Sequence, residues 1–214
     1  MRTWHAVIVL ALSATIASAQ VDTVFSSIAA HDGWIQESNE FSGLGSLLEN
    51  NSSGGSGLRL GDSAKDQQFR SIISFNTNLG TMADCAVIES AVLQLTRGTG
   101  QGANPFRTLG QIVVDIHIGG IFDTEWLDLE DFDSDVTFPG AALIEEQGGN
   151  LAVHSVDIDP QMINTYGFTQ MRLRFQQGDN DNNRADYMGF YAANHAVASR
   201  HPRLLIRLSC ECDD

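Results

Sequence analysis

The fold class that this sequence predicts is all-β: an antiparallel two-sheet β-sandwich, jelly-roll-like, with one short helix. Several segments alternate apolar and polar residues with a period of two, glycine-rich stretches connect them, and no long segment has helical periodicity. Strands with one apolar and one polar face are typical of antiparallel sheets with one packed face and one wet face. About nine such strands in one chain favour two stacked sheets.

The chain begins with a segment built like a secretory signal peptide. Arg2 gives a positive start, residues 6–16 are apolar, and Ala17-Ser18-Ala19 is a small-x-small cleavage site. A membrane anchor is the alternative, but this apolar run is too short for a hydrocarbon core that needs about 20 residues. We therefore expect residues 1–19 to be removed and residues 20–214 to form a single β-sandwich domain. The predicted localisation is secreted, extracellular or cell surface, without membrane insertion.

Nine segments are strand candidates. The clearest alternation is in residues 69–75, 87–95, 112–118, 171–175 and 204–208. The weaker candidates are residues 21–30, 58–60, 151–157 and 187–191. Within residues 87–95, the expected inward set is Val87, Ala91, Leu93 and Leu95.

One short helix is expected over residues 161–166. Asp159 can cap this helix, Pro160 suits its first position, and Gly167 can end it.

The charge balance limits the classes of partner. The formal net charge is −15, and loss of the leader with Arg2 makes it −16. Such a protein repels phosphate backbones and anionic lipid, which argues against nucleic acid and membrane surfaces as partners. It is compatible with an extracellular medium in which multivalent cations screen or bridge the acids.

The three cysteines are Cys85, Cys210 and Cys212. In an oxidising compartment we expect one pair to form a disulfide, with Cys85 bonded to Cys210 or to Cys212. The remaining thiol could link two chains or lie buried near the C-terminus, and both alternatives stay open.

The stretch GDNDNNRADYMGFY, residues 178–191, crowds oxygen ligands against an apolar run. Asp179, Asp181 and Asn183 alternate in a tight loop and can converge, and Asp186 can close the shell from the next strand. Calcium prefers six to eight such oxygens, and without a cation the clustered carboxylates repel one another. We therefore expect a calcium site here. Asn and Asp are also common turn formers, so an ordinary turn is the alternative.

A second acidic segment covers residues 122–135. It holds seven acids among fourteen residues, interleaved with Trp126, Leu127, Leu129 and Phe132. The favoured interpretation is a solvated loop pinned by these apolar residues, and a second cation site is the alternative.

Several phrases together resemble a known family. They are LRLGD at residues 58–62, FRSIISFNTNLG at 69–80, AVIESAVLQL at 86–95, GANPFRTLGQIVVDIHIGGIF at 102–122, INTYGFTQMRLRF at 163–175 and DNDNNRADYMGFYAANHAVASRHPRLLIRL at 179–208. Their order is similar to that of the disaggregatase-related, DNRLRE-type domains of secreted and cell-surface proteins. The resemblance implies a carbohydrate-binding-module-like jelly roll, a structural cation and a saccharide-facing surface. One departure is that the last strand continues into residues 210–214.

Saccharide binding needs an aromatic platform and planar polar groups that hydrogen-bond to hydroxyls. The candidate ligand-binding residues are Tyr187, Tyr191, Trp126, Arg172 and Arg174. The two tyrosines are expected on one side of their strand, with Gly189 leaving room above the sheet. The two arginines are expected on an exposed strand face, where they could equally pair with the protein's own acids.

The first hypothesis is a secreted, non-catalytic, calcium-stabilised β-sandwich that binds extracellular polysaccharide. The alternative is a self-assembling structural subunit of an extracellular filament, sheath or matrix, whose partners are copies of itself. A polysaccharide-degrading enzyme is the weaker alternative. The sequence has no GxSxG or HExxH motif and its six histidines are scattered, so no catalytic residue is indicated.

Overall fold

Antiparallel strands and one short helix make up the computed structural model, which describes residues 19–50 and 57–210. Residues 1–18 of the predicted signal peptide, and Cys212, lie outside the described residues. The strands are β1 (Ala19–Ser26), β2 (Gly33–Glu37), β3 (Gly45–Asn50), β4 (Leu58–Asp62), β5 (Gln68–Asn76), β6 (Ala86–Gln101), β7 (Ile112–Ile118), β8 (Phe138–Ile144), β9 (Val153–Ile158), β10 (Phe168–Phe175), β11 (Asp186–Phe190) and β12 (Arg203–Cys210). The predicted all-β antiparallel class is confirmed.

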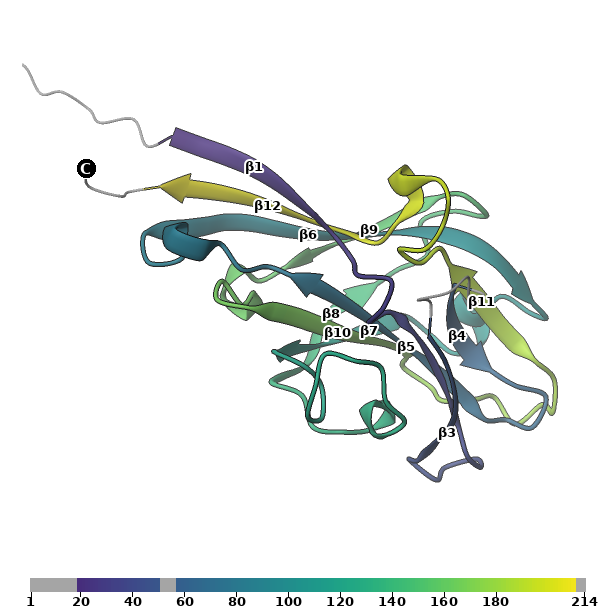
Figure 1. Cartoon of the computed structure of the whole chain (residues 1–214). Helices are drawn as coiled ribbons and strands as arrows, with labels where there is room; N and C mark the ends of the chain where they lie inside the picture. Colours follow the sequence, from purple (N-terminus) through teal and green to yellow (C-terminus); the bar gives the residue numbers. More distant parts are fainter. Residues whose placement is uncertain (1–18, 51–56, 211–214) are drawn as a thin grey trace, which may run out of the picture.

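The strands form two layers that are joined into one curled sheet (Figure 1). In the upper layer β1 pairs with β12, and β6 pairs with β12 and β9. The lower layer contains β5, β10, β7 and β8, with the β2–β3 hairpin added to β5. The end of β6 pairs with β11, and β11 pairs with β4, so that the sheet curls from one layer into the other on this side.

The main core lies between the two layers. Alternate side chains of each strand point into it, as the period-two pattern requires. Its largest fully buried members include Leu93, Leu95, Leu58, Leu60, Ile73, Phe75, Phe175 and Phe190.

A second apolar cluster lies on the outer face of the lower layer, beneath the segment of residues 122–135 (Figure 1). Ile35 and Ile72 of the sheet contact Leu127 and Phe132 of this segment, and Phe132 is fully buried. The interpretation of residues 122–135 as a loop pinned by its apolar residues is therefore confirmed for Leu127, Leu129 and Phe132 but not for Trp126, which is 58% exposed, and the face below the loop is covered rather than wet.

The helix prediction was right in its capping and wrong in its extent. Asp159 accepts a hydrogen bond from the Gln161 amide, but only a single 3-10 turn forms, η4 (Pro160–Met162). The α-helix of the described residues is α1 (Pro105–Thr108), which is capped by the side chain of Asn104 and has Pro105 at its start.

The predicted inward position of Val87 is wrong, because β6 contains a bulge. Arg207 pairs with Ser90 and Leu208 with Ile88, so one extra residue of β6 faces the partner strand. An extra residue reverses the alternation before it. Ile88 therefore packs on the core, while Val87 is 49% exposed.

Candidate functional site

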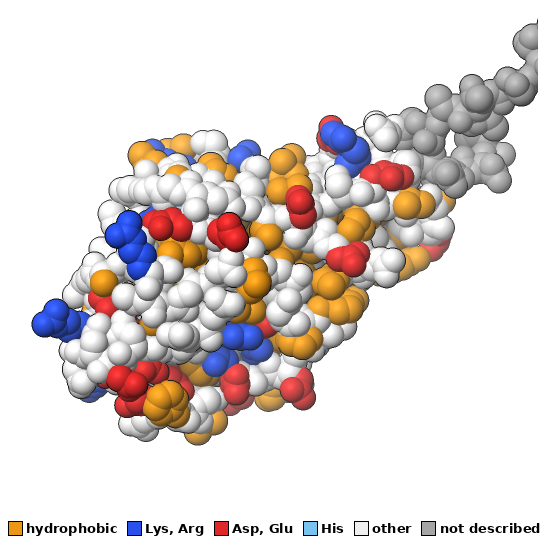
Figure 2. All heavy atoms as spheres, turned by 180° about the vertical axis from the view of Figure 1, so that it is seen from behind, with side chains coloured by type: hydrophobic (Ala, Val, Ile, Leu, Met, Phe, Trp, Pro, Cys, Tyr) orange, Lys and Arg blue, Asp and Glu red, His pale blue; other side chains and the backbone are white. Residues whose placement is uncertain are grey.

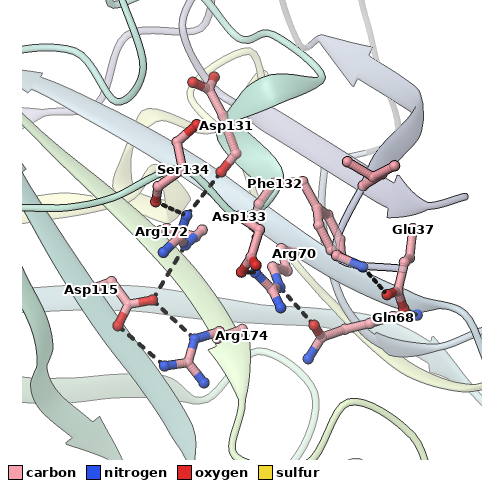
Figure 3. Close-up of polar contacts among 12 residues, drawn as sticks. Glu37, Gln68, Arg70, Asp115, Asp131, Phe132, Asp133, Ser134, Arg172 and Arg174 are labelled. Carbon is pink, nitrogen blue, oxygen red and sulfur yellow. Dashed lines mark hydrogen bonds and ion pairs between the residues drawn. The ribbon is translucent and has the colours of Figure 1, made fainter. Parts of the chain in front are cut away.

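The outer face of the lower layer carries a buried network of arginines and aspartates (Figure 3). Arg172 of β10 lies directly opposite Asp115 of β7 and is only 6% exposed. The predicted open face is therefore wrong for Arg172, because the loop of residues 122–135 covers it. Arg174 keeps 28% of its side chain exposed, at the margin of this cover.

Asp115 is the centre of this network. Its carboxylate accepts from Nε of Arg172 at 3.3 Å, from Nε of Arg174 at 2.9 Å and from the amide of Gly140 at 2.8 Å. Burial raises the pKa of Asp115, but the hydrogen bonds from Arg174 and Gly140 and the two positive charges outweigh it, so the net pKa is lowered. The interpretation in which these arginines pair with the protein's own acids is the one that the structure shows.

The same arginines hold the covering loop in place. Nη1 of Arg172 donates to the carbonyl oxygens of Asp131 at 3.1 Å and Ser134 at 2.8 Å. Nη1 of Arg70 donates to the carbonyl of Phe132 and pairs with the carboxylate of Asp133. In Figure 3 the Asp131 carboxylate points away from the guanidinium groups, so only its backbone takes part.

A hollow of about 380 Å³ lies over the end of β11 and the residues that follow it. Its lining combines three glycines with Tyr191, Asn194, His195 and Thr99, besides Phe190, Ala192 and Ala196; the glycines are Gly57, Gly98 and Gly189. Because glycines have no side chain, a ligand in this hollow can approach the backbone closely. The room predicted above Gly189 is present.

The two candidate tyrosines lie on the less buried side of β11 and just beyond it, as predicted, but they have different surroundings. The ring of Tyr191 lies 4.3 Å from the ring of His195, at the wall of the hollow. Tyr187 instead packs around Arg59, whose guanidinium carbon lies 4.7 Å from its ring and 4.2 Å from that of Trp34.

Trp126 is 58% exposed and lies away from this hollow, with its ring 4.8 Å from that of His31. Phe122 lies four positions before Trp126 and is also half exposed. It lines a separate groove of about 430 Å³, together with Leu44, Asp133 and other residues of 43–45 and 129–134. The structure therefore separates the three predicted platforms, and it brings Tyr191 alone of them into the hollow over β11.

The predicted metal loop lies on an acidic rim, where three loops meet at one edge of the lower layer. Carboxylate oxygens of Asp179, Asp181 and Glu40 lie within 4.8 Å of one another. Glu40 comes from the turn after β2, which the sequence analysis did not include because 139 positions separate it from Asp179. Acidic side chains gather at the lower left of the molecule in Figure 2, the end away from the grey chain terminus.

Mutual repulsion is the main electrostatic property of this rim. Burial and the charges of Asp181, Asp66 and Glu37 raise the pKa of Asp179. Burial and the charges of Asp179 and Asp181 likewise raise the pKa of Glu40. A hard divalent cation would relieve this repulsion, and carboxylate oxygens are the ligands that it prefers.

Asp186 and Asn183 lie outside this group of three acids. The Asp186 carboxylate is 2% exposed and accepts from the amide of Ala103 and from Nδ2 of both Asn180 and Asn182, so internal donors occupy it. The backbone N–H group of Asn183 donates to Asp66 at 3.1 Å, which ties the metal loop to the β4–β5 turn.

Asp62 of β4 completes the buried part of the rim. Its Oδ1 accepts from the amide of Asp186 at 3.0 Å, but its Oδ2 is buried and has no hydrogen-bond partner. Oδ1 of Asn180 is buried and unpartnered as well. Asp62 was not among the predicted ligands, and its place at the end of a strand, four residues before Asp66, is a weak local signal.

The cysteine pairing stays a prediction. Cys85 lies directly before β6, and the backbone of Cys210 pairs with Ala86. The register therefore brings the chain at Cys210 next to the residue that follows Cys85.

No protein-family model matches this chain, and no curated protein matches it in sequence. Among the described residues, none of the helices has the length and apolar character needed to cross a membrane.

Proposed function

We propose that this chain is a secreted, non-catalytic β-sandwich that is stabilised by calcium and binds extracellular polysaccharide in the hollow beside Tyr191. The observation that carries the proposal is the combination of a glycine floor with one aromatic wall and several polar side chains. The resemblance of the sequence to DNRLRE-type domains points to the same class of ligand.

The chemistry of the hollow fits a sugar ring. A pyranose presents an apolar face of C–H groups, which packs on an aromatic ring such as that of Tyr191, and a rim of hydroxyls. Asn194, His195 and Thr99 supply donors and acceptors for those hydroxyls. The floor cannot be rebuilt freely, because a Cβ atom at Gly189 would lie 2.8 Å from the carbonyl oxygen of Thr99.

The calcium part of the proposal is supported by the acidic rim. Glu40, Asp179 and Asp181 come from two loops, so a cation bound between them would tie the turn after β2 to the β10–β11 loop. Calcium is therefore expected to raise the melting temperature, and Asp181→Ala to reduce that rise.

Affinity electrophoresis through gels that contain soluble polysaccharides tests the binding. We expect at least one neutral or anionic polysaccharide to retard the chain, and Tyr191→Ala to abolish the retardation. Gly98→Ala should also weaken it, because the added Cβ would enter the floor while making only ordinary contacts, 3.4 Å from the Gly189 carbonyl oxygen. Tyr166→Ala is the matched control, since Tyr166 is an exposed tyrosine bonded to Asp84 outside the hollow.

Two outcomes would contradict the proposal. Equal retardation of the Tyr191→Ala variant and the Tyr166→Ala control would place binding elsewhere on the surface. Release of reducing ends or unsaturated sugars from a retarding polysaccharide would show an enzyme instead of a binding module.

Self-assembly is the second candidate function, and the edge strand β1 favours it. Among the described strands β1 pairs with β12 alone, and Val21 and Val24 on it are 42% and 55% exposed. Asp22, the charged residue of β1, is paired with Arg207 of β12, and an apolar edge without a proline can accept a strand from another copy. Light scattering after addition of calcium tests this, and Val24→Lys should suppress any assembly that uses the edge.

A further inference from the structure

We propose a second, buried calcium site between Asp62 and Asn180, beneath the exposed group of Glu40, Asp179 and Asp181. The inference rests on two unpartnered oxygens inside the fold and does not depend on saccharide binding or on occupation of the exposed group.

The first observation is the pair of unpartnered oxygens. Asp62 is 0% exposed, and its Oδ2 has no hydrogen-bond partner. Oδ1 of Asn180 is also buried and unpartnered. A buried polar atom without a partner destabilises the fold, so each of these two acceptors needs a donor or a cation.

Hydrogen bonds show that the two oxygens belong to one cluster. Asp186 links them, because its amide donates to Oδ1 of Asp62 at 3.0 Å and its Oδ2 accepts from Nδ2 of Asn180 at 3.0 Å. The latter bond also fixes the Asn180 amide, because exchanging its oxygen and nitrogen would bring Oδ1 against the Asp186 carboxylate. The Oδ1 atom of Asn180 is thereby kept free to act as a ligand.

The local charge is the second observation. The Asp62 carboxylate is fully buried, and its Oδ1 accepts from a backbone N–H group and not from a positively charged side chain. Asp186 and Asp66 are themselves 2% and 4% exposed. A buried carboxylate without a positively charged partner is costly, and calcium binds both the carboxylate oxygen and the amide oxygen that Asp62 and Asn180 leave unused.

Such a site would have a structural consequence. Asp62 ends β4 and Asp186 begins β11, the two strands that pair where the sheet curls between layers. A cation held by Asp62 and by Asn180 of the loop before β11 would fasten this loop to the end of β4, beside the start of β11. The exposed group, in contrast, would hold only the outer parts of two loops.

The test uses the purified full chain and calcium alone, with Asp62→Asn as the variant and Glu40→Gln as the control for the exposed group. Each protein is melted in chelator and in calcium, and terbium luminescence excited through the aromatic residues reports binding directly. For the wild type we expect a rise of roughly 5–10 °C when calcium exceeds its dissociation constant about a hundredfold. Glu40→Gln should keep most of this rise, whereas Asp62→Asn should lose most of it and bind calcium roughly tenfold or more weakly.

Behaviour in chelator separates a cation site from a defect in folding. Asp62→Asn supplies an NH₂ donor and removes a buried charge, so without calcium it should melt at or above the wild-type temperature. If it fails to fold, Asn180→Ala takes its place, with the same expected loss of the calcium response. A full calcium response in these variants would overturn the buried site. A buried water would then be the donor to the free oxygens of Asp62 and Asn180. Loss of the response in Glu40→Gln alone would support the exposed group and overturn the buried one, and no response in the wild type would overturn both.

Discussion

Removal of the Asp115 carboxylate should destabilise the protein far more than its position on an outer sheet face suggests. This side chain is 1% exposed, and it receives hydrogen bonds from Arg172, Arg174 and Gly140. Asp115→Ala leaves the guanidinium of Arg172, which is 7% exposed, without its charge partner. Breaking a buried pair from one side costs about 3–5 kcal/mol. Because Arg174 can turn towards water, we expect the lower end, about 3 kcal/mol.

The assay is differential scanning calorimetry of the variant beside an exposed control. For a chain of this size about 3 kcal/mol corresponds to a fall in melting temperature of roughly 6–12 °C. Asp22→Ala is the control, because the Asp22–Arg207 pair has the same chemistry but 70% and 51% exposed side chains. We expect that control to melt within about 1 °C of the wild type, as exposed pairs contribute little.

The pH dependence has a definite sign. Since the net pKa of Asp115 is lowered from its ordinary 3.8, the stabilisation by its carboxylate is fully present above pH 3.8. This stabilisation is lost as the pH falls below 3.8 and through the lowered pKa of the folded protein. The difference between wild type and Asp115→Ala should therefore shrink in acid. Equal melting temperatures for Asp115→Ala and Asp22→Ala at neutral pH would refute the reasoning, because they would show that the covering loop does not depend on this network.

Three further substitutions test other parts of the fold. His154 is 0% exposed, neither of its ring nitrogens has a hydrogen-bond partner, and burial lowers its pKa. The wild type should therefore lose stability as the pH falls below 6.5. His154→Leu should raise the free energy of unfolding by about 1–2 kcal/mol, most of all in acid, and a lower melting temperature at every pH would contradict this. Gly61→Ala should cost roughly 3 kcal/mol or more in urea unfolding, since at φ +127° the added Cβ would lie 2.2 Å from the Asp186 carbonyl oxygen. Gly80→Ala is the control and should cost about 1 kcal/mol, because Gly80 has φ +60° and open space around it. Equal costs for the two variants would show that the contact at Gly61 relaxes. Burial raises the pKa of Asp32 to about 7, so its favourable contribution is present below 3.8 and is lost as the pH rises from 3.8 through about 7. Asp32→Asn should flatten the fall in the free energy of unfolding over this pH range, and an unchanged slope would assign that fall to other groups.

The sequence predicted what depends on local alternation. Strands β5 and β10 appear where the period-two pattern places them, and the apolar residues expected to face the core, such as Ile73, Phe75 and Leu173, are buried. The position of Val87 could not be predicted in the same way, because a single extra residue in β6 changes its face and nothing in the local pattern marks the bulge.

The site was predicted only where its residues are close in sequence. Tyr191 and Gly189 lie two positions apart, and the hollow contains both. Arg172 appeared exposed because its strand alternates cleanly, yet a loop about forty positions earlier covers it through backbone carbonyls, which no residue type encodes. Glu40 and Asp62 reach the rim through the pairing of strands, so that topology rather than composition brings them to the metal loop.

The sixteen-residue strand β6 ties the two layers into one cooperative unit. Because one uninterrupted strand has partners in both layers, neither layer can detach while the other stays intact. Unfolding should therefore be one all-or-none event, and amides at both ends of that strand should exchange with solvent only when the whole chain opens. A protein with this construction offers proteases few partly open states to cut.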